Sequence, residues 1–308
     1  MPVESGGDTA RANGPARVGC VYRPQLAPER LASVARRADD AGVSELWLWE
    51  DCFLSGGIST AAIALSHSTR LTVGVGVLPA PMRNVALTAM EIATLSRAFP
   101  GRVRIGVGHG VQSWMQQIGQ RVESPVTLLR EYLSCLKLLL AGQRVSFDGR
   151  YVSLDDVGLD WPPVGDVEML CAATGPRTLA LSGELADGTI ISSGTSPDAL
   201  RAATAHIAMG QASAGRTQPH AVVAYLVCTT GPEADVQAAE EISHWDYDAD
   251  GDVAVFGTAT AISEGMRRWF AAGAGTVVLQ PTADADMDRF LDMVGTEIRP
   301  MIGDAGRP

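Results

Sequence analysis

The sequence predicts an α/β protein folded as a (β/α)8 barrel, with insertions after the fourth and seventh strands. Short apolar runs rich in β-branched residues alternate with longer segments of helical apolar spacing, and eight such units follow one another. The 308 residues suffice for one barrel of this kind, which needs about 250. We therefore predict a single domain over residues 16–308, preceded by a disordered tail over residues 1–15, which are small and polar.

The eight predicted strands are short and apolar. They are Arg17–Tyr22, Glu45–Trp49, Leu71–Val77, Val103–Val107, Val167–Ala172, Gly188–Ser192, Ala221–Cys228 and Thr276–Gln280. Two of the intervening helices have clear start signals. Asn84 is a candidate N-cap before an apolar stripe that runs to Phe99, and Ser124 precedes a proline at the first position of a second amphipathic segment.

Two stretches do not fit the repeat and are predicted insertions. Residues 141–164 contain GRYVSLDD and are expected to form a loop with a short hairpin. Residues 243–257 contain HWDYDADGD, for which a solvated loop is favoured. The alternative is a lid over the barrel mouth, in which Trp245 would contact the substrate.

Composition narrows the possible partners. A net charge of −11 and a pI near 4.9 argue against nucleic acid or an anionic membrane surface as a partner. The five cysteines are scattered and lack the spacing of a zinc site, so no metal is expected and a reducing cytoplasm is favoured. The N-terminus lacks the pattern of a secretory signal, and no apolar run approaches the roughly 20 residues of a membrane span.

In such a barrel the reactive groups lie where the strands end. Glu50 and Asp51 follow the second strand, and because they are adjacent their side chains should point to opposite faces. After the fourth strand, glycines around His109 let a flat ring approach the backbone, whereas the same glycines match a dinucleotide fingerprint poorly. His109 could donate a proton or be a packed structural histidine, and Trp114 could stack on a ligand or fill the core.

The fifth strand runs into a helix through Ala-Ala-Thr-Gly-Pro. This arrangement exposes backbone amides at the helix start, where Arg177 and Thr178 can add donors for an anion such as a phosphate. The alternative is that Gly175 and Pro176 only make the turn.

Four segments together resemble the luciferase-like flavin and deazaflavin oxidoreductases over about residues 17–300. They are ELWLWEDCF, RLTVGVGVLPAPMRNVALTAMEIATLSRAFPGRVRIGVGHG, SPVTLLREYL and ATGPRTLALSGELADGTIIS. Within that superfamily the chain resembles coenzyme F420-dependent reductases and dehydrogenases more than it resembles bacterial luciferase. The resemblance implies hydride transfer between F420 and a small organic metabolite with a C=C, C=N or C=O bond. Members of the superfamily are commonly dimers, so the resemblance also implies a homodimer.

The resemblance also implies site residues. A non-prolyl cis peptide at Gly76-Val77 would form a backrest behind the cofactor ring, continued by Leu78 and Pro79. The further cofactor contacts would be Asp51, Gly108, His109, Gly110, Trp114, Thr174, Gly175, Pro176, Arg177 and Thr178. Asp51 and His109 are the candidate catalytic residues, and the substrate would contact Arg23, Cys52, Trp114 and Trp245.

Two departures from the family pattern bear on the substrate. Cys52 stands where the sugar-phosphate dehydrogenases have a histidine, and Val111 stands where they have an acid/base glutamate. The sugar-phosphate reaction is therefore not expected. An FMN-dependent monooxygenase and a non-catalytic cofactor-binding or assembly protein are the alternative functions.

Overall fold

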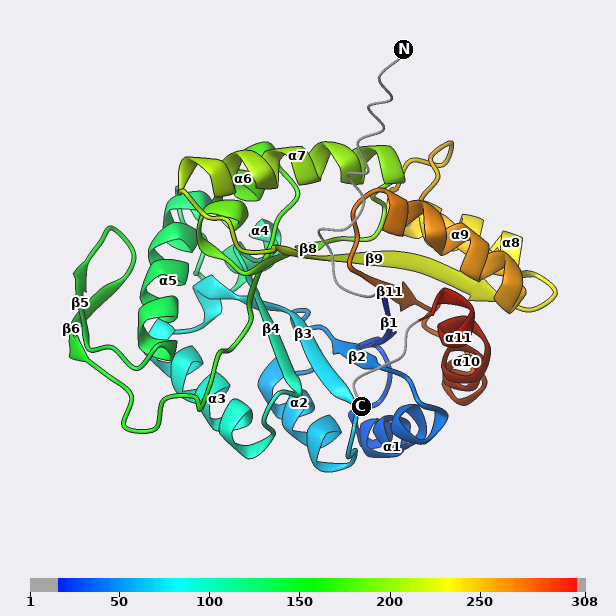
Figure 1. Ribbon diagram of the computed structural model, residues 1–308, viewed down its shortest axis with the longest axis horizontal. Helices are drawn as coiled ribbons and strands as arrows, with labels where there is room; N and C mark the ends of the chain where they lie inside the picture. The colour runs from blue at the N-terminus through cyan, green and yellow to red at the C-terminus, as the bar shows by residue number, and fades with distance from the viewer. Residues whose placement is uncertain (1–15, 304–308) are drawn as a thin grey trace, which may run out of the picture.

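A computed structural model describes residues 16–303 and confirms the barrel. Nine parallel strands form one sheet, and all but β10 close into a barrel because β8 pairs with β9 (Figure 1). The barrel strands are β1 (Arg17–Tyr22), β2 (Glu45–Leu48), β3 (Thr72–Pro79), β4 (Val103–Gly108), β7 (Met169–Ala172), β8 (Gly188–Ile191), β9 (Ala221–Thr230) and β11 (Thr276–Gln280). The predicted strands agree to within three residues at each end. The predicted tail over residues 1–15 lies outside the described residues, and the single domain over residues 16–308 stays a prediction.

Helices surround the barrel, as Figure 1 shows. They are α1 (Leu31–Ala41), α2 (Gly57–Ser66), α3 (Val85–Ala98), α4 (Gln112–Gln117), α5 (Pro125–Leu140), α6 (Pro176–Leu185), α7 (Pro197–Ser213), α8 (Ala234–His244), α9 (Ala259–Ala271), α10 (Met287–Met293) and α11 (Arg299–Ile302). Both predicted start signals are confirmed: Asn84 accepts a hydrogen bond from the Ala86 amide and Ser124 accepts one from the Thr127 amide. No helix within residues 16–303 is long and apolar enough to cross a membrane.

The two insertions have different outcomes. The predicted hairpin is confirmed as β5 (Val145–Asp148) paired antiparallel with β6 (Ser153–Val157). The prediction of a solvated loop over residues 243–257 is wrong at its end, because β10 (Ala254–Gly257) pairs parallel with the last four residues of β9. The pairing of β8 with β9 ends at Ala224, so the later residues of β9 offer backbone groups to a further strand on the side away from β11. Four residues are too short for a periodic signal in the sequence.

The N-terminal end of the barrel is closed by a buried ion network. Arg104 contacts Glu45 at 2.9 Å and Glu168 at 2.6 Å, and its guanidinium lies 5.4 Å from the centre of the Trp47 ring. The Trp47 indole donates to Glu45 at 2.9 Å, and Thr276 accepts from Arg104 at 3.3 Å. Burial alone would lower the pKa of Arg104, but the two carboxylates raise it overall.

Candidate active site

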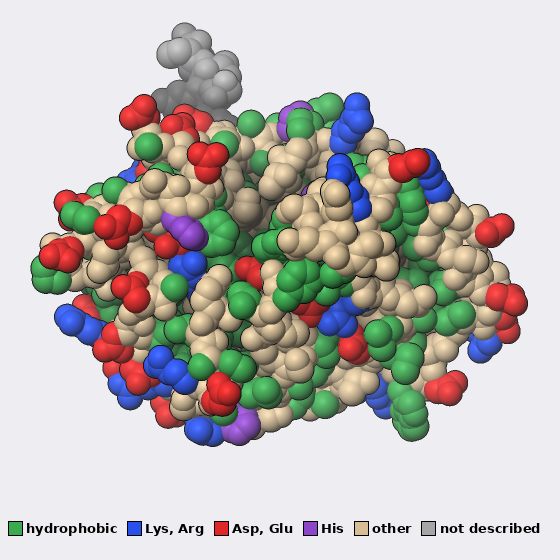
Figure 2. Space-filling model, turned by 180° about the vertical axis from the view of Figure 1, so that it is seen from behind, with side chains coloured by type: hydrophobic (Ala, Val, Ile, Leu, Met, Phe, Trp, Pro, Cys, Tyr) green, Lys and Arg blue, Asp and Glu red, His purple; other side chains and the backbone are tan. Residues whose placement is uncertain are grey.

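A pocket of about 180 Å³ lies at the C-terminal end of the barrel, between the ends of β2, β3, β4 and β7 and helix α4. Hydrophobic side chains gather in the middle of the hollowed face of the molecule seen in Figure 2, and charged side chains surround them. The residues that line the pocket are Glu50, Asp51, Val77, Pro79, Gly108, His109, Gly110, Val111, Trp114, Ala172, Ala173 and Thr174. The structure thus brings together predicted site residues from four separate strand ends.

The adjacent carboxylates Glu50 and Asp51 have different environments. Glu50 accepts from Arg83 at 2.7 Å and 3.0 Å and from the Gly57 amide at 2.5 Å, so it joins the segment after β3 to the start of α2. The Asp51 carboxylate accepts no hydrogen bond from any residue that the structure describes. Burial raises the pKa of Asp51 to about 6, against the opposing effect of the Arg23 charge. Asp51 is therefore the carboxyl group at this end that is free to exchange a proton.

The predicted irregularity in β3 is present. The peptide bond between Gly76 and Val77 is cis, and the register of β3 against β4 shifts between Val75 and Leu78. Val77 and Pro79 consequently line the pocket, while Leu78 is buried and points away from it. Gly76 faces the barrel interior, where a Cβ atom would collide with the Tyr225 hydroxyl. Gly76 thus leaves room for the Tyr225 hydroxyl, whereas Val77 and Pro79 form one wall of the pocket.

The residues after β4 form the opposite side of the pocket. A Cβ atom at Gly108 would lie 2.9 Å from Cγ2 of Val77, so glycine keeps this part of the pocket open. His109 Nδ1 lies 2.9 Å from the Gly110 carbonyl oxygen and must donate to it, which leaves Nε2 available to a ligand. Trp114, on α4, is half-buried and lines the pocket.

The start of α6 lies beside the pocket through Thr174. Gly175 is the N-cap and supplies no side-chain cap, and Pro176 has no amide hydrogen to donate. The backbone amides of Arg177 and Thr178 have no acceptor among residues 16–303. The Arg177 side chain is exposed, whereas the Thr178 side chain is buried, so Thr178 can offer a ligand its amide.

Three predicted substrate residues do not line this pocket. Arg23 and Trp245 lie together on another side of the mouth, where the Arg23 guanidinium is 5.8 Å from the centre of the Trp245 ring. Cys52 is partly exposed and its Sγ lies 3.3 Å from Sδ of Met82. Burial, and then the charges of Glu50 and Asp51, raise the pKa of the Cys52 thiol, so it is not an activated nucleophile.

Sequence reasoning assigned no role to two residues of the mouth, Trp49 and Glu241. Trp49 has a buried Nε1 without an acceptor among the described residues, and its ring meets Tyr225 edge-on at 5.7 Å. Glu241, on α8, pairs with Arg23 at 2.5 Å. Trp49 follows Trp47 with the spacing of one strand face, which is a usable signal. Glu241 follows another glutamate on an amphipathic helix and gives no signal of burial.

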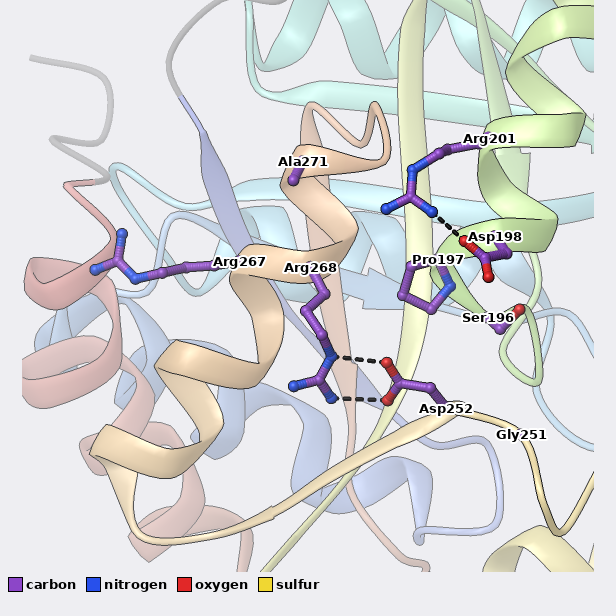
Figure 3. Close-up of a pocket in the computed structure, with 9 residues that line it drawn as sticks. All are labelled: Ser196, Pro197, Asp198, Arg201, Gly251, Asp252, Arg267, Arg268 and Ala271. Atoms are coloured by element: carbon purple, nitrogen blue, oxygen red, sulfur yellow. Dashed lines mark hydrogen bonds and ion pairs between the residues drawn. The ribbon is translucent and has the colours of Figure 1, made fainter.

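A larger pocket of about 590 Å³ lies outside the barrel, between α7 and α9 (Figure 3). Two of its three arginines are paired, Arg201 with Asp198 and Arg268 with Asp252, and Arg267 points away from both. The residues that line this larger pocket include no unpaired carboxyl group and no imidazole group, so the smaller pocket is the candidate active site. Within residues 16–303, no group of three or more His, Cys, Asp or Glu side chains is arranged to hold a metal ion.

Known proteins are similar to this chain in sequence. A 5,10-methylenetetrahydromethanopterin reductase from Methanolobus tindarius is 29% identical over 210 residues, which cover 68% of this chain and 64% of the reductase. An F420-dependent glucose-6-phosphate dehydrogenase from Kineococcus radiotolerans is 30% identical over 238 residues, covering 72% of this chain and 69% of the dehydrogenase. The chain thus spans slightly less than two thirds of the methanopterin reductase it matches.

Solved structures agree with the fold. The coenzyme F420-dependent tetrahydromethanopterin reductase from Methanopyrus kandleri superposes with a TM-score of 0.81 at 20% identity, covering 94% of this chain and all of the reductase. An F420-dependent secondary alcohol dehydrogenase in complex with an F420-acetone adduct gives a TM-score of 0.83, also at 20% identity, covering 94% of this chain and 99% of the dehydrogenase. The model of the luciferase-like monooxygenase family matches residues 12–296. The chain therefore belongs to the luciferase-like monooxygenase family, as its motifs predict.

Proposed function

We propose that the protein is an oxidoreductase that transfers a hydride between coenzyme F420 and a small organic substrate at a C=C, C=N or C=O bond. The observation that carries this proposal is the pocket between the irregular end of β3 and Gly108, with the Asp51 carboxyl, which accepts no hydrogen bond from the described residues, at its edge. An F420-dependent dehydrogenase at 30% identity supports the choice of F420, whereas a solved monooxygenase constituent in complex with FMN has the same fold at only 16% identity.

The pocket fits a flat heterocycle carrying a phosphorylated side chain. Val77 and Pro79 would support one ring face, and the open position at Gly108 would let the ring approach the backbone. The amides of Arg177 and Thr178 at the start of α6 would bind the phosphate, because a helix N-terminus attracts anions. When bound, F420 supplies or accepts the hydride.

The remaining chemistry falls to side chains of this chain. Asp51 would give a proton to the reduced substrate or remove one in the reverse direction, because its pKa of about 6 leaves both protonation states accessible near neutral pH. His109 Nε2 would hydrogen-bond the ring edge or the substrate, since Nδ1 is engaged by Gly110. Trp114 would cover the pocket and exclude water.

Titration of the purified protein with F420 and with FMN, followed by fluorescence, tests the cofactor. We expect F420 to bind, and Gly108→Ala to weaken binding about tenfold or more because the new methyl group displaces Val77. Gly275→Ala is the matched control, since its nearest neighbour to a Cβ atom is 3.8 Å away. Binding of FMN alone would favour the monooxygenase, and binding of neither cofactor would favour the non-catalytic alternative.

We further propose a homodimer in the cytoplasm. Exposed apolar side chains on α3 and on the segment between β2 and α2 support an interface: Met90 is 57% exposed, Leu87 46% and Phe53 59%. Met90→Glu should shift the mass measured by light scattering from dimer to monomer, whereas Met209→Glu, on the exposed face of α7, should not. A monomeric wild type would refute the dimer. The five unpaired cysteines are consistent with a reducing compartment.

A further inference from the structure

The buried carboxylate of Glu241 accepts hydrogen bonds from several elements at the mouth of the barrel. Oε1 of Glu241 accepts from Arg23 Nη1 at 2.5 Å, from Trp245 Nε1 at 2.8 Å and from Gln280 Nε2 at 3.3 Å. The side chains of Arg23 and Glu241 are 3% and 10% exposed. A buried pair that is hydrogen-bonded in this way holds both charges in one fixed arrangement.

The hydrogen bonds continue from Gln280 to the insertion. Ser193, after β8, donates to Gln280 Oε1 at 2.7 Å, so its oxygen accepts from the Tyr247 hydroxyl at 2.8 Å. The Tyr247 ring packs on Gly194, which has a positive φ of 81° and leaves no room for a side chain. The insertion is thereby anchored to the barrel mouth, and Glu241 cannot swing away from Arg23 without breaking these contacts.

Arg23 lies close enough to the pocket to interact electrostatically with Asp51. It directly follows Tyr22, which pairs with Leu48 at the end of β2, and Asp51 of the pocket follows that strand. The charge of Arg23 opposes the burial that raises the pKa of Asp51. Its Nη2 donates to no residue that the structure describes.

Two other arginines lie near this end. Arg83 is held by Glu50 and Glu91 at 2.7 Å and 2.6 Å, and Arg177 is exposed at the start of α6, on the side proposed for the cofactor phosphate. On its own side of the mouth, Arg23 therefore offers a hydrogen-bond donor whose positive charge is compensated by Glu241.

We propose that the Arg23–Glu241 pair selects the charge of the substrate, so that the site accepts uncharged acceptors and rejects carboxylates and phosphate esters. Glu241 neutralises the cation that would attract an anionic group, and the ionised Asp51 repels such a group. Arg23 Nη2 remains able to bind a neutral carbonyl oxygen. This inference rests on the proposed function and names the substrate class of the same site.

Two ketones of nearly the same shape, which differ in the charge of one ring substituent, test this selection in the F420-loaded protein: 4-oxocyclohexanecarboxamide and 4-oxocyclohexanecarboxylate, with affinities measured by calorimetry at pH 8. The wild type should bind the neutral ketone about tenfold or more tightly than the carboxylate. Glu241→Gln keeps the shape of the side chain but removes its charge, so it should shift the ratio of the two affinities toward the carboxylate by about tenfold or more. Arg23→Gln added to Glu241→Gln should cancel that gain.

Glu240→Gln is the matched control, because Glu240 is exposed on the same helix and its substitution changes the net charge equally. The proposal is overturned if the wild type binds the carboxylate as tightly as the neutral ketone, or if Glu241→Gln shifts the ratio no more than Glu240→Gln does. F420 titration of the same samples separates this outcome from failure of the proposed function: without F420 binding the proposed function fails, and the ratio is then measured on the cofactor-free protein.

Discussion

Both ends of the barrel hold buried ion pairs, but the C-terminal end also holds a largely buried carboxyl group, Asp51, that pairs with none of the described residues. At the N-terminal end Arg104 is neutralised by Glu45 and Glu168, and the Trp47 indole satisfies Glu45 further. At the C-terminal end Asp51 is largely desolvated and accepts no hydrogen bond from the described residues. An unpaired carboxyl group costs stability, so its presence beside a pocket indicates a function that the paired network does not need. Each prediction below changes one side of this comparison.

The largest expected effect is on stability at the N-terminal end. Arg104→Met should lower the free energy of unfolding by about 3–5 kcal/mol, because it leaves the buried Glu45 without its cation. Chemical denaturation measures this loss. Arg268→Met is the control, since its pair with Asp252 is half-exposed and should be worth less than about 1 kcal/mol. Equal losses in the two variants would contradict the structural role of the network.

At the C-terminal end, Asp51→Asn should affect catalysis far more than stability. Loss of the proton donor should slow oxidation of reduced F420 by about 10²–10⁴-fold, measured by absorbance with an acceptor that the wild type reduces. The free energy of unfolding at pH 7 should stay the same or rise, because the variant removes a carboxylate that burial disfavours. Asp284→Asn, at an exposed position, is the control. A stable variant with unchanged turnover would remove Asp51 from the mechanism.

The dependence of stability on pH should have opposite signs at the two ends. His220, just before β9, donates to or accepts from Thr189 at 2.7 Å, and burial lowers its pKa from 6.5 to about 4. Between those values the unfolded chain binds a proton that the folded chain does not, so stability is lost as the pH falls from 6.5 to 4. The loss is about 1.4 kcal/mol per unit of pKa difference. The pKa of Asp51 is raised instead, so its contribution is lost as the pH rises from 3.8 to about 6.

Thermal unfolding across pH 4–7 separates the two residues. His220→Gln should reduce the loss of stability as the pH falls from 6.5 to about 4. Asp51→Asn should reduce the loss of stability as the pH rises from 3.8 to about 6. Variants with the same slope as the wild type would show that neither residue controls this range. The Cys228 and Cys20 thiols do not contribute there, because burial keeps their pKa values above the usual range.

The sequence predicted the pocket better than it predicted the residues around it. Strand ends in a parallel barrel must meet at one face, so Asp51, His109 and Thr174 could be brought together from period and order alone. The contact between Arg23 and Glu241 joins residues 218 positions apart, and neither the helical pattern nor a motif specifies it. The sequence did not predict β10, because four residues carry little periodicity and the free edge of β9 exists only once the barrel is closed.

The smallest expected effect concerns Cys52, next to Asp51 in sequence but outside the pocket. Cys52→Ser should change turnover by no more than about threefold, because a thiol with a raised pKa supplies no thiolate at neutral pH. Iodoacetamide should likewise modify Cys52 more slowly at pH 7 than it modifies free cysteine. A loss of turnover comparable to that of Asp51→Asn would mean that the sulfur takes part in the reaction. The boundary of the active site would then have to include the contact of Cys52 with Met82.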